Sequence, residues 1–251
     1  MTTFTATPDT ATGAVNLVIT QTKPVRSITR ANGYGSASVR PAQGQLPSAA
    51  TGTTLIPDYE GAHGVNSYTL YHTDGTTEIA SATLTVDKPW LLVPIAPNYS
   101  EQVETITDYS AGRETFSTAH QIIGRPDPIV NFGKLGTRKG TLDIFTASLE
   151  DAARVTRVFD RGEAVLLKQT VPGMDMYLAA TSLDLAPYSV QGEADTRWKL
   201  SVGYLEILRP AGNLAGALGW TFDALALAYP SFDAQLAAFA SFDDLTLGDT
   251  R

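Results

Sequence analysis

Residues 68–86 have the sequence YTLYHTDGTTEIASATLTV, in which two alternating apolar runs flank a turn. Tyr68 and Leu70 belong to the first run, and residues 80–86 form the second. An apolar residue at every second position is typical of a strand with one buried face, and Asp74-Gly75 between two such runs is typical of a hairpin. The stretch therefore predicts two antiparallel strands.

The same period of two extends upstream to residue 14. Val15, Leu17 and Ile19 alternate there, and Asn32-Gly33 and Pro57-Asp58 give turn signals between the runs. An antiparallel β-sandwich fits this pattern best. Tyr68 has two readings in such a fold: a tyrosine-corner residue whose hydroxyl satisfies backbone groups at a bend, or an ordinary half-buried tyrosine.

Prolines interrupt the pattern after this region. Pro89, Pro94 and Pro97 make residues 87–98 extended and poor in hydrogen-bond donors, which predicts a linker. Residues 99–128 are polar and have no clear period. They predict either a long loop or a locally ordered insertion.

A second β-rich region follows, with one helix inside it. Ser148 is an N-cap candidate, and Gly162 supplies a left-handed stop, so the helix should span about residues 148–161. The helix should bury one face against the sheet, so the second domain is predicted to be a β-sandwich with one helix on its flank. That face contains Leu149, Ala152, Val155 and Phe159, and the strand candidates are residues 129–132, 141–146, 164–169, 176–183 and 197–208.

Length and composition indicate folded domains. The 251 residues suit two domains and an appendage, and a hydrophobic fraction of 43% with 18% charged residues is typical of globular chains. We therefore predict domains at residues 1–90 and 91–210, followed by a tail at 211–251. Since cysteine is absent, disulfides and thiolate zinc sites are excluded.

The charge balance disfavours nucleic acid as a partner. With 18 basic and 26 acidic side chains, the formal net charge is −8, whereas phosphate attraction needs clustered Lys and Arg. No window reaches eighteen apolar residues, so no membrane partner is predicted. The N-terminus lacks the basic start and apolar run of a secretory signal, which predicts an origin in the cytoplasm.

The tail contains a repeat of ten residues. Thr221-Phe222-Asp223, Ser231-Phe232-Asp233 and Ser241-Phe242-Asp243 each open with a capping hydroxyl and place an acid in the first helical turn. Each unit predicts a short helix, and such helices are marginal in water unless their aromatic faces dock on another surface. We predict that this surface belongs to a partner protein; the alternative is that the tail packs on its own subunit. The predicted partner-binding residues are Phe222, Leu225, Tyr229, Phe232, Leu236, Phe239, Phe242 and Leu245.

Motifs of enzyme chemistry are missing. The sequence has no phosphate-binding Gly-rich loop, no His-Glu-x-x-His and no Gly-x-Ser-x-Gly elbow, and the spacing of its histidines (His63, His72 and His120) matches no metal motif. Four carboxylates could supply the acid and base of a glycoside hydrolase, but a solvated acidic loop is the simpler interpretation. They are Glu101, Glu104, Asp108 and Glu114. We predict no enzyme activity, no cofactor and no metal.

Several stretches resemble the minor tail proteins of siphophages that infect actinobacteria, which are distal tail or tail-tip components. The decad tail contributes to the likeness, although Phe stands here where Trp is usual and Asp follows it directly. The other stretches are Asp58-Tyr59-Glu60 to Tyr68, Pro89-Trp90-Leu91, Gly124-Arg125 with Gly140-Thr141-Leu142, and Thr196-Arg197-Trp198 to Arg209-Pro210.

The resemblance implies a fibronectin III/Ig-like first domain, a tail-tube-like second domain and a homo-oligomeric ring, a hexamer or a trimer. It also implies a structural subunit of the virion tail tip or baseplate, made in the host cytoplasm and bound to tail-tube, tail-hub and other minor tail proteins. One alternative is an adhesin for the host surface or carbohydrate, with Tyr34, Tyr59 or Tyr71 presented from loops. Another is a hydrolase that degrades the cell wall.

Overall fold

The computed structural model describes residues 3–41, 46, 52–171, 173–188 and 196–210. These residues are mainly β, with antiparallel sheets and the helix α1 (Leu149–Asp160). They divide into two compact units: residues up to 102 with 166–175 and Pro210, and residues 103–165 with 176–209. The observed division differs from the predicted domains, because residues 91–102 and 166–175 belong to the first unit.

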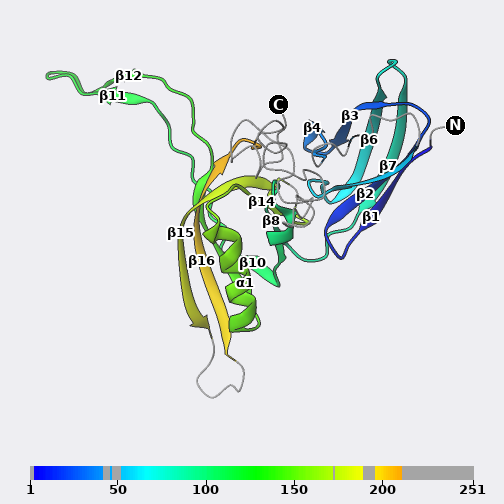
Figure 1. Cartoon of the computed structure of the whole chain (residues 1–251). Coiled ribbons are helices and arrows are strands. Elements are labelled where there is room, and N and C mark those ends of the chain that lie inside the picture. Colours follow the sequence, from blue (N-terminus) through cyan, green and yellow to red (C-terminus); the bar gives the residue numbers. More distant parts are fainter. Residues whose placement is uncertain (1–2, 42–45, 47–51, 172, 189–195, 211–251) are drawn as a thin grey trace, which may run out of the picture. The chain divides into compact units, whose positions relative to one another are not determined.

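The first unit contains a β-sandwich of two antiparallel sheets (Figure 1). One sheet has the order β1 (Thr3–Asp9), β2 (Ala14–Gln21), β5 (Gly52–Asp58). The other has the order β4 (Gly35–Ser38), β3 (Val25–Asn32), β6 (Gly64–His72), β7 (Thr77–Leu84). Strands β1 and β2 contact β7 across the sandwich, so the coarse prediction of a β-sandwich is confirmed here.

The alternating residues of the sequence form the core of this sandwich. Val15, Leu17 and Ile19 of β2 are fully buried, as are Leu70 of β6 and Leu84 of β7. The hairpin predicted at residues 74–75 joins β6 to β7 and is closed by a 2.9 Å bond from His72 N to Thr76 O. Strand periodicity therefore identified the buried face of the sandwich correctly.

A buried carboxylate ties the two sheets together. Both oxygens of Asp58, at the end of β5, accept from Arg30 Nη1 of β3 at 2.7 Å, and Asp58 Oδ2 also accepts from Tyr68 of β6 at 3.0 Å. Burial alone lowers the pKa of Arg30, but Asp58 reverses this and the net pKa is raised. Arg30 and Asp58 are only 5% and 2% exposed.

Two sequence predictions are corrected at this cluster. Pro57-Asp58 is not a turn, because both residues lie in β5 and pair with β2. Tyr68 fits neither reading, since it is fully buried and its hydroxyl donates to a carboxylate rather than to backbone groups. Burial and Asp58 together raise the pKa of Tyr68, as expected for a phenol held beside an anion.

The predicted linker at residues 87–98 is wrong. Residues 90–92 form the buried strand β8 (Trp90–Leu92), which pairs with β9 (Glu101–Gln102) and with residues 166–168 of β14 (Val165–Lys168). The prolines flank this short strand rather than interrupt it. Pro97 begins the 3-10 helix η1 (Pro97–Tyr99), where its missing N–H is not needed.

Residues 166–175 follow part of the second unit in the chain but belong to the first unit. Two ionisable side chains of this segment form its buried polar contacts. Lys168 is fully buried, and its Nζ donates to Gly13 O at 2.6 Å and Tyr59 O at 2.8 Å. Burial lowers the pKa of Lys168 to about 8. Burial also raises the pKa of Asp175 to about 6, although its carboxylate accepts from Gln169 N at 2.9 Å.

The second unit contains an antiparallel sheet covered on one face by α1. Within this unit, its strands follow the order β10 (Thr105–Thr107), β13 (Lys139–Thr146), β16 (Arg197–Ile207), β15 (Met176–Tyr188). The described residues of this unit thus form one sheet with a helix rather than the predicted second sandwich. Leu142, Ile144, Leu200 and Val202 form the buried face of this sheet. The strands predicted from the sequence in this region match the observed ones closely, and α1 contacts three of them, β13, β15 and β16.

Helix α1 begins and ends as predicted. Ser148 Oγ accepts from Asp151 N at 3.1 Å, and Gly162 after the helix has a φ of +67°. Ala152, Val155 and Phe159 are buried as expected, together with Val158. The exception is Leu149, which is exposed because it lies at the edge of the first turn.

Replacing the central carboxylate should destabilise the first unit strongly. Asp58→Ala leaves Arg30 buried without a counter-ion, so we expect the free energy of unfolding to fall by about 3–5 kcal/mol. Urea denaturation measures this. The control Lys23→Met breaks the exposed ion pair with Asp74. It should leave the midpoint nearly unchanged, and equal effects of the two substitutions would contradict the assignment.

Asp175 should make stability depend on pH. Its folded pKa of about 6 exceeds the ordinary 3.8, so the folded state holds the proton more tightly and stability falls as pH rises from about 4 to 6. Asp175→Asn should therefore increase stability by on the order of 1–2 kcal/mol at pH 7 and have little effect below pH 4. Thermal unfolding at several pH values tests this. A variant that is less stable at pH 7 would refute it.

Candidate assembly surface

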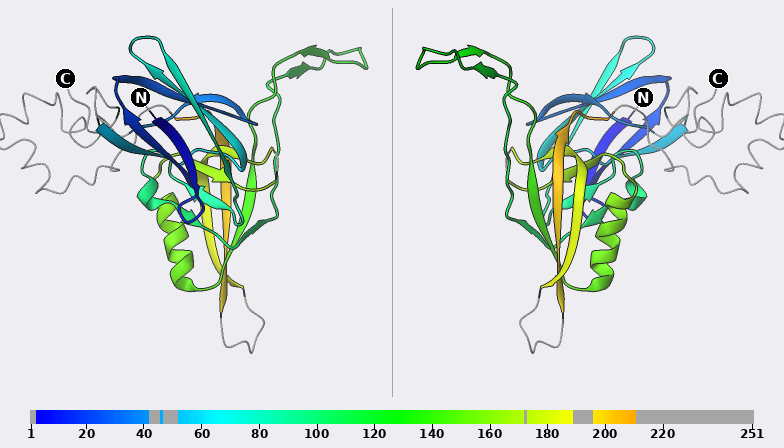
Figure 2. Two further views of the ribbon diagram at one scale, coloured as in Figure 1. Left: turned by 90° about the vertical axis from the view of Figure 1, so that its right-hand side faces the viewer. Right: turned by 90° about the vertical axis from the view of Figure 1, so that its left-hand side faces the viewer.

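A two-stranded ribbon continues the β10–β13 hairpin beyond the sheet of the second unit (Figures 1 and 2). Isolated bridges join Gly112 to Lys139 and Thr115 to Leu135, and β11 (Thr118–His120) then pairs with β12 (Ile129–Asn131). We name residues 110–141 the arm. Since an extended strand rises about 3.3 Å per residue, the ten residues 111–120 reach about 30 Å from the sheet.

The two strands of the arm approach each other closely. A Cβ at Gly140 would overlap the Ser110 carbonyl, and a Cβ at Gly133 would lie 2.5 Å from the Phe116 carbonyl carbon. Both positions therefore require glycine. The pairing confirms that residues 99–128 contain a locally ordered insertion rather than an irregular loop.

Large apolar side chains of the arm are uncovered. Phe116 is 75% exposed, Phe132 is 87% exposed and Ile123 at the tip is fully exposed. Within the described part of the chain, 19 large hydrophobic residues are exposed, and seven of them lie in the 20 residues 116–135. The other four are Ile122, Ile129, Val130 and Leu135. Exposed apolar residues at this density mark an interaction surface.

Both faces of the arm contribute to this surface. Val130 lies opposite Ala119 on one face, whereas Ile129 lies opposite His120 on the other. A two-stranded ribbon has no core of its own in which to bury such residues. Full burial of a Phe or Ile side chain contributes about 1.5–3 kcal/mol, so covering the arm would stabilise an assembly substantially.

Polar and aromatic contacts hold the base of the arm to the sheet. Arg138 donates twice from its side chain to Glu206 of β16, at 2.7 and 2.9 Å, and once from its backbone at 3.0 Å. Tyr109 stacks on Tyr204 with ring centroids 5.9 Å apart, and Tyr204 donates to Ser110 O at 2.7 Å. The Arg138 hydrogen bonds lower the pKa of Glu206. The arm is thus attached through side chains as well as backbone.

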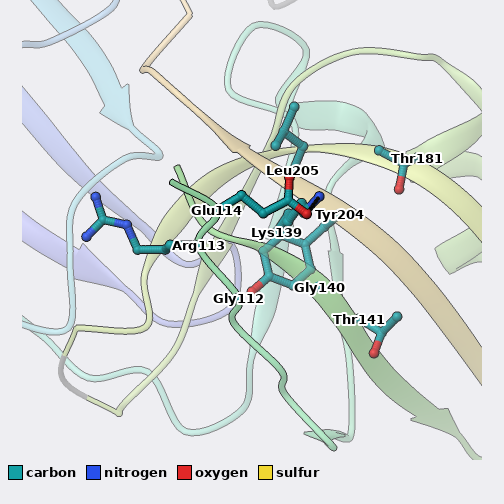
Figure 3. A pocket seen from close by; sticks show the side chains of 9 residues that line it. All are labelled: Gly112, Arg113, Glu114, Lys139, Gly140, Thr141, Thr181, Tyr204 and Leu205. Atoms are coloured by element: carbon teal, nitrogen blue, oxygen red, sulfur yellow. Dashed lines mark ion pairs between the residues drawn. The ribbon is translucent and has the colours of Figure 1, made fainter. Parts of the chain in front are cut away.

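A shallow pocket of about 610 Å³ lies beside this base (Figure 3). Its charged residues are Arg113, Glu114 and Lys139, and Lys139 Nζ contacts Glu114 Oε1 at 2.5 Å. The other lining residues are Gly112, Gly140, Thr141, Thr181, Tyr204 and Leu205. Because its carboxylate is already paired, the pocket offers no obvious acid or base for catalysis.

The candidate carboxylates of the hydrolase hypothesis follow an extended path. Glu101 lies in β9, Glu104 directly precedes β10, Asp108 follows β10 with a φ of +49°, and Glu114 lies on the arm. Of the four, only Glu114 lines the pocket. Asp108 and Glu114 are six residues apart on an extended chain, roughly 20 Å, which exceeds the separation that glycoside hydrolysis needs.

The histidines and tyrosines singled out in the sequence have different surroundings. His63 accepts from Val86 N, His72 contacts Glu78 at 3.2 Å, and His120 lies in the exposed β11. Tyr34 is exposed, although its hydroxyl accepts from Gly173 N at 3.3 Å. Tyr71 is also partly exposed, and Tyr59 is half-buried.

Two further findings concern the described part of the chain. No three or more of its His, Asp or Glu side chains are grouped so as to hold a metal ion. It also contains no helix with the length and apolarity needed to cross a bilayer.

The predicted partner-binding residues of the tail repeat lie outside the described residues. The sequence does not predict the arm as a surface, because its residues 116–128 belong to the polar stretch that predicts a loop or an insertion. The apolar residues of this stretch nevertheless indicate more than a solvated loop. Ile122, Ile123, Ile129 and Phe132 flank the turn around Gly124 at a higher density than a solvated loop requires.

No family of proteins matches the sequence, and no characterised protein is significantly similar to it.

Weakening the contacts at the base of the arm should increase local opening of the arm more than opening of the sheet. Glu206→Gln removes the charge that Arg138 pairs with and should cost about 1 kcal/mol at pH 7. Since the folded pKa of Glu206 lies below the ordinary 4.5, this difference should shrink as pH falls below 4.5. Hydrogen exchange at Gly112 N and Lys139 N measures the opening.

The matched control is Glu163→Gln. Glu163 pairs with Arg161, two residues away, so the pair holds no distant strands together. Glu163→Gln should leave the hydrogen-exchange protection of Gly112 N and Lys139 N unchanged. Unchanged protection in Glu206→Gln as well would show that the backbone ladder alone holds the arm.

Proposed function

We propose that this protein is a structural virion subunit of a phage tail tip or baseplate, related to distal tail and other minor tail proteins. It forms a homo-oligomeric ring, either a hexamer or a trimer, and docks tail-tube, tail-hub or other minor tail proteins through residues 211–251. It has no enzymatic role in this proposal. It is made in the host cytoplasm and ends in the virion tail tip.

The observation that carries this proposal is the arm with its uncovered apolar side chains. A catalyst needs a concave site with convergent polar groups, whereas an assembly subunit needs exposed surface that neighbours bury. The sandwich of the first unit fits a fibronectin III/Ig-like domain, and the helix-covered sheet of the second unit fits a tail-tube-like domain. These assignments rest on the sequence resemblance as well as on the strand order.

Mass measurement tests the proposal. Sedimentation equilibrium of the full chain over a wide concentration range should give a closed oligomer of three or six subunits, and the purified protein should bind the tail-tube or tail-hub proteins of its phage. A strict monomer at every concentration, with no affinity for those proteins, would contradict it.

Deleting residues 219–251 tests the role of the tail repeat separately. The two units should keep their circular dichroism spectrum and unfolding midpoint, because the core residues that the structure describes all precede residue 211. Incorporation into phage particles, measured by mass spectrometry of purified virions, should fall. If the truncated chain unfolds instead, the repeat belongs to the subunit's own core.

A further inference from the structure

We infer that the arm docks on the acidic surface of a second copy of this chain. This inference rests on the proposed function and deepens it, since it names the contact between subunits. It concerns the arm, residues 110–141, and the body, which we define as the other residues that the structure describes.

The arm and the body have net charges of opposite sign. The arm contains five basic and two acidic side chains, a net charge of +3, whereas the body contains 12 basic and 17 acidic side chains, a net charge of −5. Opposite charges of this size attract two copies and guide their encounter. The body of a second copy is therefore an electrostatic complement to the arm.

Part of the positive charge remains available for such a contact. Arg125 pairs with Asp127, Lys139 with Glu114, and Arg138 with Glu206 of the body. The other two basic residues of the arm, Arg113 and Lys134, enter no ion pair among the residues that the structure describes. Lys134 is exposed within the apolar stretch 129–135, so charge and apolar surface coincide there.

The same charges favour contact of arm with body over contact of arm with arm. Two arms would bring net charges of +3 together, which opposes a symmetric exchange of arms. A contact between different surfaces of two copies is heterologous, and repetition of it closes a ring when the rotation between subunits permits. A heterologous contact of this kind is consistent with the ring of the proposed function, whereas a symmetric exchange of arms would give an isolated dimer.

Backbone groups can add to this contact. In the part of the chain that the structure covers, β11 and β12 pair only with each other, so each has an open outer edge. An edge strand of a second copy could extend this ribbon by hydrogen bonding, which is a common mode of recognition. Apolar residues on both faces would then be covered by the surfaces next to that strand.

Site-specific cross-linking tests the partner directly. The chain has no cysteine, so Ile123→Cys introduces one thiol at the arm tip, to which benzophenone maleimide is attached. After irradiation of mixed 15N-labelled and unlabelled full chains, mass spectrometry should find cross-links between chains that end on acidic peptides of the body. The control Ile79→Cys, labelled in the same way at an exposed position of β7, should give few cross-links between chains.

Variants of the arm test its contribution to affinity. Phe116→Ser with Phe132→Ser should weaken self-association about 100-fold or more, while the control Ile79→Ser should not. Lys134→Glu should weaken self-association at low salt but not at high salt, where charges are screened. The control Arg26→Glu should leave self-association unchanged at both salt concentrations. If the double variant disturbs the ribbon, Ile123→Ser at the tip, outside the ladder, repeats the test.

The outcomes separate the two proposals. Cross-links confined to one chain, or joining arm to arm, would overturn the inference. An oligomer that persists unchanged in the arm variants would also overturn it while the proposed function stands. A wild-type chain that stays monomeric and binds no tail protein would overturn both.

Discussion

The antiparallel ladder that runs from β10–β13 to β11–β12 is the constraint on which the second unit and its surface depend. Residues 105–107 pair with β13, and the same two strands continue outward through the Gly112–Lys139 bridge to the arm. Pairing satisfies the backbone groups that face the partner strand, and water can satisfy those on the outer edges, without any layer above or below the ribbon. A ribbon of this kind can extend far from a core, and its side chains then remain in solvent.

The first unit buries an ion pair and a lysine, whereas the arm of the second unit exposes a dense group of apolar side chains. In the first, Arg30, Asp58 and Lys168 are buried and bonded, so polar groups contribute to the interior of the sandwich. In the second, apolar groups such as Phe116 and Phe132 lie outside. Buried ion pairs fix a particular packing, whereas exposed apolar residues gain free energy only when a neighbour covers them. The arm of the second unit is therefore the region where covering by a neighbour would bury the most closely spaced apolar side chains.

Predictions from periodicity and capping residues are confirmed where they depend on residues within a single strand, hairpin or helix. Alternation in β2 and in the β6–β7 hairpin depends on one buried face, and the cap at Ser148 depends on residues within one turn of α1. The same rules failed at Trp90. Its strand is three residues long and pairs with residues 166–168, more than seventy positions away, so no local period could reveal it.

The sequence by itself determined the β-rich class, the main strands, the position of α1 and the lack of any disulfide or thiolate metal site, because periodicity, capping and composition are properties of neighbouring residues. Only the tertiary structure decided that Tyr68 donates to Asp58, that Lys168 binds the Gly13 and Tyr59 carbonyls, and that residues 110–141 form a paired arm. These features join residues far apart in the chain. Pairing and burial between distant residues depend on where the whole fold brings them, which the spacing of residues along the chain does not encode.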